Sequence, residues 1–276
     1  MTELLVMRNL AFSYDGKHPV LKDISFSIGA GEVVALVGRN GAGKSTLLRL
    51  LNGLLRPSAG QLFIEGKDTA AQKVHEIARV IGTVFQAPEA QIFNSTVEAE
   101  LGFGPAQLDL SEKERQERVA LAAKRSGLEG LFSHHPLDLD QAQKRFLAIG
   151  SVLATAPRLL LLDEAQRGLD RPSRDRLLTI IAEERAAGHA VILVCHDMEF
   201  VAACADRVLG LAEGHLAVDS PTLAFFANRE LTEKVSVEQP QALRISQGLG
   251  LSPSLTAEGL AAAISAKLQE NHALNP

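Results

Sequence analysis

The stretch that decides the fold of this chain is Gly38-Arg39-Asn40-Gly41-Ala42-Gly43-Lys44-Ser45, which matches the phosphate-binding pattern G-x-x-x-x-G-K-S. Its glycines let successive backbone N–H groups turn inward around phosphates, its lysine reaches the terminal phosphates, and its serine hydroxyl ligates Mg²⁺. An apolar run at 32–37 precedes the loop, and a helical run that starts at Thr46 follows it. The positive end of that helix would face the phosphates. A chance glycine-rich turn would not explain this strand and helix, so the sequence predicts a nucleoside triphosphate site.

The composition excludes few classes of function. Of the 276 residues, 46% are apolar and 22% charged, and the net charge of −5 gives no electrostatic reason to expect nucleic-acid binding. Cys195 and Cys204 lack the spacing of metal ligands, which favours a reduced, intracellular protein. The first residues do not resemble a secretory signal, and no run approaches the ~20 apolar residues that cross a bilayer. If the chain acts at a membrane, we expect it to act from outside the lipid.

The apolar pattern predicts strands alternating with helices. Residues 3–28 alternate apolar and polar positions around two turn signals, which indicates an antiparallel hairpin. The runs at 158–164 and 190–194 are short and continuously apolar, as in parallel strands that are covered on both faces. Further elements are predicted as strands at 32–37 and 62–64 and as helices at 111–126, 142–155, 172–187 and 256–270. The fold class is therefore α/β.

An acidic pair, Asp163-Glu164, ends the apolar run at 158–164. An aspartate at the carboxyl end of a strand can hold Mg²⁺, often through water, and a glutamate beside it can orient or deprotonate an attacking water. By itself such a pair could be a strand that ends in solvated carboxylates. Downstream of a phosphate loop it indicates triphosphate hydrolysis.

Taken together, these motifs resemble those of the ATP-binding-cassette (ABC) ATPases, and the match covers about residues 3–225. Tyr14 matches the aromatic residue that stacks on adenine in that family, and Gln86 matches the glutamine that contacts Mg²⁺ and relays to the transport partner. Gly168-Leu169-Asp170 resembles the loop that crosses to the other subunit of the dimer. His196 resembles the histidine that contacts the γ-phosphate. The resemblance lies in the order and spacing of these residues, since each of them alone is a weak signal.

The resemblance implies a P-loop NTPase with a RecA-like core, an antiparallel β layer and a helical subdomain at about 87–156. ATP and Mg²⁺ would be its cofactors. Ser45, Gln86 and Asp163 would organise Mg²⁺, and Glu164 and His196 would be catalytic. The ATP-binding domain would occupy residues 1–228, and a change of composition after 228 predicts a small C-terminal subdomain at 229–276.

One motif departs from the family. The family's Leu-Ser-Gly-Gly-Gln signature corresponds here to Leu139-Asp140-Gln141-Ala142-Gln143, and Ala165-Gln166 also replaces the usual pair after the glutamate. A carboxylate that faces a triphosphate is repulsive, although the N-terminus of a helix tolerates it in isolation. Side chains at the glycine positions also block close backbone approach. We therefore interpret the signature as degenerate. Either the chain pairs with a different ATPase subunit in an uneven dimer, or it forms a homodimer whose two sites both tolerate the change.

A second run, at 84–105, resembles the energy-coupling-factor (ECF) transporter ATPases, which share its Gln-x-Pro-Glu, Thr-Val-Glu and Phe-Gly-Pro pieces. It implies a short helix after Gln86 in a groove for the coupling helices of a membrane scaffold, although an ordinary linker is the alternative. The segments 239–244 and 248–251 resemble the region through which ECF ATPases dimerise.

The implied protein is a peripheral subunit on the cytoplasmic face of the cell membrane. Its partners would be a second ATPase subunit, an integral membrane scaffold and a substrate-binding membrane subunit, with no nucleic acid. The cargo would be a transition-metal ion such as cobalt or nickel, or a vitamin. Two alternatives stay open: a weakly hydrolysing regulatory subunit, and a soluble ABC ATPase that is not coupled to transport.

Overall fold

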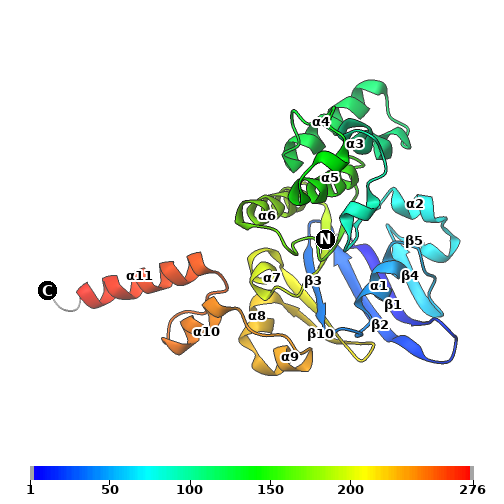
Figure 1. The fold of residues 1–276 in the computed structure, drawn as a ribbon. Coiled ribbons are helices and arrows are strands. Elements are labelled where there is room, and N and C mark those ends of the chain that lie inside the picture. The colour runs from blue at the N-terminus through cyan, green and yellow to red at the C-terminus, as the bar shows by residue number, and fades with distance from the viewer. Residues whose placement is uncertain (1–2, 274–276) are drawn as a thin grey trace.

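The computed structural model describes residues 3–273 and is built on two sheets (Figure 1). The larger sheet has six strands in the order β10-β9-β3-β8-β7-β6, and its neighbours pair in parallel except at the β9–β10 edge. The strands are β3 (Val33–Gly38), β6 (Ile81–Val84), β7 (Leu159–Asp163), β8 (Ala190–Val194), β9 (Arg207–Ala212) and β10 (His215–Pro221). β3 and β8 are buried along their whole length, which explains their uninterrupted apolar sequences.

The smaller sheet is antiparallel, with the order β2-β1-β4-β5. Its strands are β1 (Glu3–Ser13), β2 (Pro19–Gly29), β4 (Ala59–Ile64) and β5 (Lys67–Asp68). One apolar core joins this sheet to the larger one, and it includes Leu47, Leu50 and Leu51 of α1 (Lys44–Leu51). Between β5 and β6 lie η1 (Thr69–Ala71) and α2 (Val74–Ala78). The hairpin predicted over 3–28 is confirmed.

The segment between β6 and β7 forms a helical subdomain, drawn in green at the top of Figure 1. Its elements are η2 (Pro88–Gln91), α3 (Val97–Ala106), α4 (Glu112–Ser126), η3 (Pro136–Asp138) and α5 (Gln141–Leu153). α4 begins as its sequence predicts, because Ser111 and Glu114 form a capping box. The subdomain has its own apolar core, which includes Leu101 of α3, Ala123 of α4 and Leu147 of α5.

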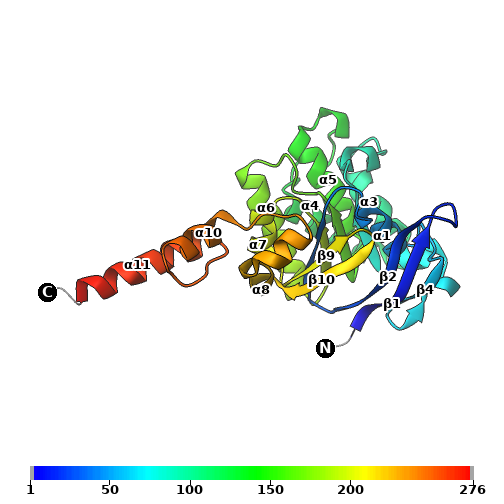
Figure 2. The same ribbon diagram turned by 90° about the horizontal axis from the view of Figure 1, so that it is seen from below.

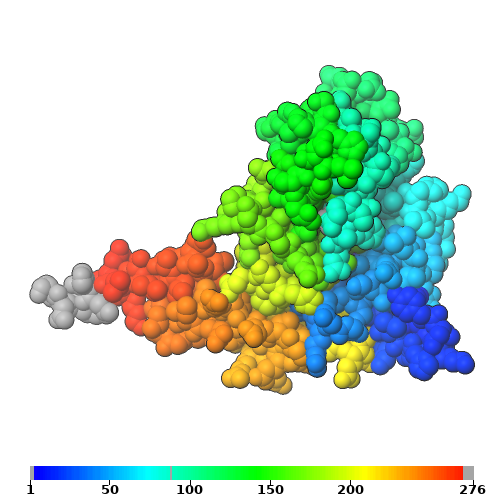
Figure 3. Space-filling model, viewed as in Figure 1, coloured from blue at the N-terminus to red at the C-terminus, as the bar shows by residue number. Residues whose placement is uncertain are grey.

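The other face of the larger sheet carries α6 (Arg171–Ala186), α7 (Met198–Cys204) and α8 (Thr222–Ala227). The chain then passes through α9 (Arg229–Lys234) to α10 (Gln241–Gly248) and α11 (Ala257–Ala273). α10 and α11 form an arm that extends away from the rest of the molecule in both ribbon views and in the space-filling view (Figures 1, 2 and 3). In the part of the chain that the structure describes, no helix is long and apolar enough to traverse a bilayer.

Candidate nucleotide-binding site

The phosphate loop joins β3 to α1 and requires glycine at two of its positions. Gly38 has φ +141°, and a Cβ there would lie 2.3 Å from the carbonyl oxygen of Leu211 on neighbouring β9. Gly43 has φ +105°, and a Cβ there would lie 2.6 Å from Cδ2 of Leu21. The loop is therefore held tightly between β9 and β2, so its backbone N–H groups are fixed before a ligand arrives.

Lys44 begins α1 and folds back over the loop. Its ammonium donates hydrogen bonds to the carbonyl oxygens of Gly38 (2.6 Å) and Arg39 (3.0 Å). Burial lowers the pKa of Lys44, while the nearby Glu164 and Asp163 carboxylates oppose that shift. The side chain therefore places a cation at the centre of the loop, where it can neutralise phosphate charge.

Asp163 ends β7 beside the loop. Burial raises the pKa of its carboxyl, the Glu164 carboxylate raises it further, and Lys44 works in the opposite direction. Its carboxylate accepts no hydrogen bond from the described residues, so it is a half-buried anion that a cation would stabilise. A single carboxylate of this kind fits Mg²⁺, which takes one or two protein oxygens together with phosphate and water.

Glu164 and His196 follow adjacent strands, β7 and β8, and lie 3.4 Å apart between Oε1 and Nε2. Glu164 has φ +52°, and its N–H donates to the carbonyl oxygen of Val194 at 3.0 Å. Both side chains line a cavity of about 630 Å³ that Asn40 and Gln86 also line. This cavity thus brings together four of the residues that the sequence singled out, from the phosphate loop, from the end of β6 and from the ends of β7 and β8.

Tyr14 lies beside the first turn of α1. The residue is 58% exposed, and its hydroxyl lies 3.2 Å from Oγ1 of Thr46. The ring of Phe12 supports it edge-on, with 4.9 Å between centroids. An aromatic face held beside the first turn of α1 is available for stacking on a base.

The signature segment lies elsewhere, at the start of α5. Asp140 is the N-cap: its Oδ1 accepts the N–H of Gln143 at 2.8 Å, and Oε1 of Gln143 accepts the N–H of Asp140 at 3.0 Å. The carboxylate that the sequence marked as repulsive therefore stabilises its own helix. Residues 139–143 do not line the two cavities bordered by the phosphate loop.

Several residues of the site carry no sequence signal. Arg174 pairs with Asp197 (2.5 Å), the residue after His196. Arg145 on α5 donates to the carbonyl oxygens of Ala165 and Arg167, just before the loop at 168–170. Their partners are distant in sequence, so no local pattern could identify them.

The C-terminal segment also borders the site. A cavity of about 720 Å³ lies between Arg39, Asn40 and His196 on one side and residues 236–239, 241 and 244 on the other. The N–H of Gln241 donates to Oε1 of Glu199 at 2.6 Å, which fastens α10 to the helix that follows His196.

Comparison with known proteins identifies the family of this chain. The sequence profile of the ABC transporter family matches residues 21–167. A protein of Pyrococcus furiosus described as an ABC transporter ATP-binding protein is 38% identical over 93% of this chain and 98% of its own length. The energy-coupling factor transporter ATP-binding protein EcfA2 of Caldanaerobacter subterraneus subsp. tengcongensis is 38% identical over 88% of both chains.

The solved structures agree with this placement. The structure of cbiO1 from Clostridium perfringens, described as part of the ABC transporter complex cbiONQ, superposes with a TM-score of 0.77. It is 32% identical and covers 91% of this chain and 100% of its own. The chain therefore belongs to the ABC transporter family, as an ATP-binding subunit that hydrolyses ATP.

Proposed function

We propose that this chain powers an ECF-type importer, and that the groove beside Gln86 receives the membrane scaffold. The groove is a cavity of about 320 Å³ between β6 and α3. Three of its aromatic side chains are exposed: Phe85 by 40%, Phe93 by 65% and Phe103 by 47%. Exposed aromatic rings around a concave site are typical of a protein interface. This groove is the observation that carries the proposal.

Polar contacts hold the groove in shape. Gln91 accepts the N–H of Phe85 at 3.0 Å and donates to the carbonyl oxygen of Thr83 at 3.2 Å. The buried Glu100 accepts the N–H groups of Phe93 (3.2 Å) and Asn94 (2.9 Å). An apolar helix that docks here would therefore contact a surface whose shape these hydrogen bonds hold. Gln86 directly follows Phe85 of that surface.

The proposed chemistry assigns each site residue a role. The loop amides of 38–46 and Lys44 hold the ATP phosphates, and Tyr14 stacks on the adenine. Ser45, Asp163 and Gln86 hold Mg²⁺, which withdraws charge from the phosphates when bound. Glu164 orients and polarises the attacking water, and His196 contacts the γ-phosphate. The loop at 168–170 reaches the second subunit.

The proposed partners follow from the names of relatives and from the arm. Of the relatives named above, one is described as an energy-coupling factor transporter protein and another as part of the cbiONQ complex. We assign to this chain a membrane scaffold, a substrate-binding membrane subunit and a second ATPase, at the cytoplasmic face of the membrane. The cargo would be a transition-metal ion such as cobalt or nickel, or a vitamin. Residues 229–276 would form the dimerisation subdomain, since Ile245, Leu249 and Leu268 are exposed on the arm.

A second candidate is a weakly hydrolysing member of an uneven ATPase pair, which the signature favours. Asp140, Gln141 and Ala142 replace the serine and glycines that would contact the partner's ATP. The phosphate loop, Asp163, Glu164 and His196 are complete in sequence. In an uneven pair, this chain's ATP would meet the partner's signature.

The test is retrieval of the full-length tagged chain from detergent-solubilised native membranes, with Phe93→Asp compared against Leu223→Asp. Leu223 is also exposed, by 49%, but lies on α8, far from the groove in sequence. We expect the parent chain and Leu223→Asp to bring down a polytopic membrane protein, and Phe93→Asp to lose it while still binding ATP. Equal retrieval by all three proteins, or none by the parent, would contradict the proposed coupling.

A further inference from the structure

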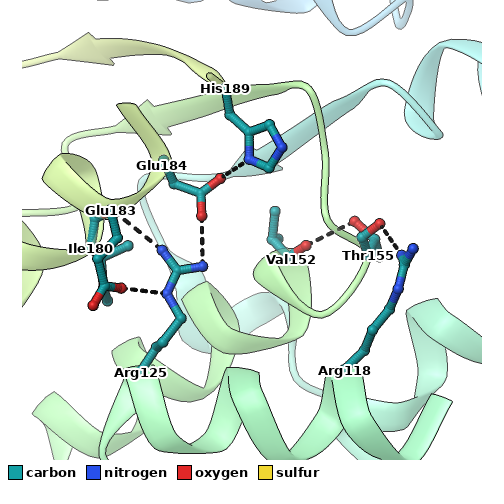
Figure 4. A network of polar contacts seen from close by, with 8 residues as sticks. All are labelled: Arg118, Arg125, Val152, Thr155, Ile180, Glu183, Glu184 and His189. Carbon is teal, nitrogen blue, oxygen red and sulfur yellow. Dashed lines mark hydrogen bonds and ion pairs between the residues drawn. The ribbon is translucent and has the colours of Figure 1, made fainter. Parts of the chain in front are cut away.

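One arginine of α4, Arg125, connects the helical subdomain to α6 of the core (Figure 4). Arg125, near the end of α4, has all three of its partners on α6. Its Nη1 lies 2.6 Å from Oε1 of Glu184, and its Nε donates to Oε2 of Glu183 at 2.6 Å. Its Nη2 also donates to the carbonyl oxygen of Ile180 at 3.3 Å. The planar guanidinium thus fixes both the distance and the direction between the two helices.

The central partner is firmly anchored in the core. The Glu184 side chain is only 4% exposed, and its second oxygen contacts Nδ1 of His189 at 2.8 Å, immediately before β8. A buried carboxylate requires partners for both oxygens, and Glu184 has one on each side. Loss of Arg125 would therefore leave a buried anion with the histidine alone.

A second arginine crosses in the opposite direction. Arg176 of α6 donates to the carbonyl oxygen of Ser126 at 3.1 Å, and its guanidinium lies 5.5 Å from the ring centroid of Phe146 on α5. α4 ends at Gly127 with φ +67°, where a Cβ would overlap the Arg176 guanidinium. Glycine at the end of α4 therefore leaves room for the Arg176 side chain.

The surrounding interface is open. A cavity of about 700 Å³ separates α4 from α6, lined by Arg118, Leu121, Leu153, Ala187 and others as well as by Arg125 and Glu184. Apolar side chains do not fill this space, so α4 is joined to α6 chiefly by the polar contacts of Arg125 and Arg176, whereas α5 is joined to the core by its buried Phe146, Ile149 and Leu153.

We propose that Arg125 is a positioning residue for ATP hydrolysis, which holds the helical subdomain at a fixed angle to the phosphate loop through Glu184. The subdomain carries residues 139–143 and most of the groove beside Gln86, so its angle determines where both face. This inference rests on the proposed function for its kinetic consequence but not for its structural one.

The chain provides a matched control. Arg118 lies on the same helix and lines the same cavity, and its Nη1 donates to the carbonyl oxygen of Thr155 at 2.8 Å. Thr155 follows α5, so this contact stays inside the helical subdomain (Figure 4). Arg118→Met and Arg125→Met remove the same chemical group from α4, but only Arg125→Met removes a link between the two parts.

The experiment measures inter-label distances in the full chain by pulsed electron spin resonance. Spin labels are attached through Lys113→Cys on α4 and Glu230→Cys on α9, with Cys204→Ser to remove the half-buried native thiol. We expect one narrow distance distribution in this parent and in Arg118→Met. We expect a shifted and broader one in Arg125→Met, with Arg125→Lys between them because it keeps the charge but not the fork.

Kinetics supply the second readout. Arg125→Met should lower kcat for ATP about tenfold while changing KM little, because displaced groups slow the chemistry but the phosphate loop still binds ATP. The proposal is overturned if Arg125→Met keeps the parent's distance distribution, or if Arg118→Met broadens it equally. A parent that hydrolyses no ATP would count against the proposed function, and the distances would still decide the role of Arg125.

Discussion

His196 and Glu164 face each other across the ends of two adjacent parallel strands, with Nε2 of the histidine 3.4 Å from Oε1 of the glutamate. The glutamate backbone is left-handed at φ +52°, and its N–H bonds to β8 at Val194. This conformation turns the Glu164 side chain out of the strand and into the cavity that Asn40 and Gln86 line. We propose that a carboxylate held there polarises the water that attacks a γ-phosphate.

Glu164→Gln should therefore lower ATP turnover by about 10²-fold or more, since a general base contributes that much to the rate. The amide is nearly isosteric with the carboxylate, so ATP binding should persist. Turnover and equilibrium ATP binding are measured on the same preparation. Glu129→Gln, at an exposed glutamate of the helical subdomain, is the control and should retain full activity. Undiminished hydrolysis by Glu164→Gln would exclude the proposed role.

Alanine substitutions at Gly38 and Gly41 distinguish the energetic cost of backbone strain from that of steric overlap. Both have positive φ, but a Cβ at Gly41 meets nothing within 4 Å, whereas one at Gly38 would lie 2.3 Å from the Leu211 carbonyl oxygen. Gly41→Ala should cost about 1–2 kcal/mol of unfolding free energy from strain. Gly38→Ala should cost a further 1–3 kcal/mol or so, because β9 must move. Urea unfolding of both variants gives the difference, and equal losses would show that β9 does not constrain the loop.

Local sequence predicted those elements whose stabilising contacts are local. The strands at 158–164 and 190–194 were recognisable because buried parallel strands are continuously apolar, and the observed β7 and β8 fall inside those ranges. The helix at 111–126 was recognisable from its capping box. The phosphate loop can be recognised from its own eight residues and from the strand and helix patterns that flank them.

Contacts that orient one part against another were not predictable in this way. Arg125 and Glu184 belong to no motif. The charge patterns of α4 and α6 do not distinguish them from the other charged residues of these helices. The same holds for Gln241, whose N–H donates to Glu199 and so joins α10 to α7. Asp140 differs from these residues, because its capping contact with Gln143 lies within the first turn of α5 and agrees with the tolerance of a helix N-terminus for a carboxylate.

Cys195, directly before His196, should be chemically inert in the folded protein. Burial raises the pKa of its thiol to about 12, so almost no thiolate is present at pH 8. We expect iodoacetamide to leave Cys195 unmodified at pH 8 in the native chain and to modify it fully in urea, as read by peptide mass spectrometry. Rapid native labelling would show that the segment around His196 opens far more than the structure indicates.

Asp140→Asn isolates the charge of the signature from its capping role. Asparagine caps helices as well as aspartate does, so the unfolding free energy should stay within about 0.5 kcal/mol of the parent. If Asp140 faces a partner's triphosphate, removing a like charge at about 4 Å is worth about 1–4 kcal/mol, and ATP hydrolysis by the purified chain alone should rise at least about fivefold. Asp138→Asn removes the same charge two residues earlier, on an exposed side chain outside α5, and should leave the rate unchanged. Faster ATP hydrolysis by both variants would show that overall charge matters. Unchanged hydrolysis by both would mean that the Asp140 charge does not limit turnover, and would favour a homodimer that tolerates this charge.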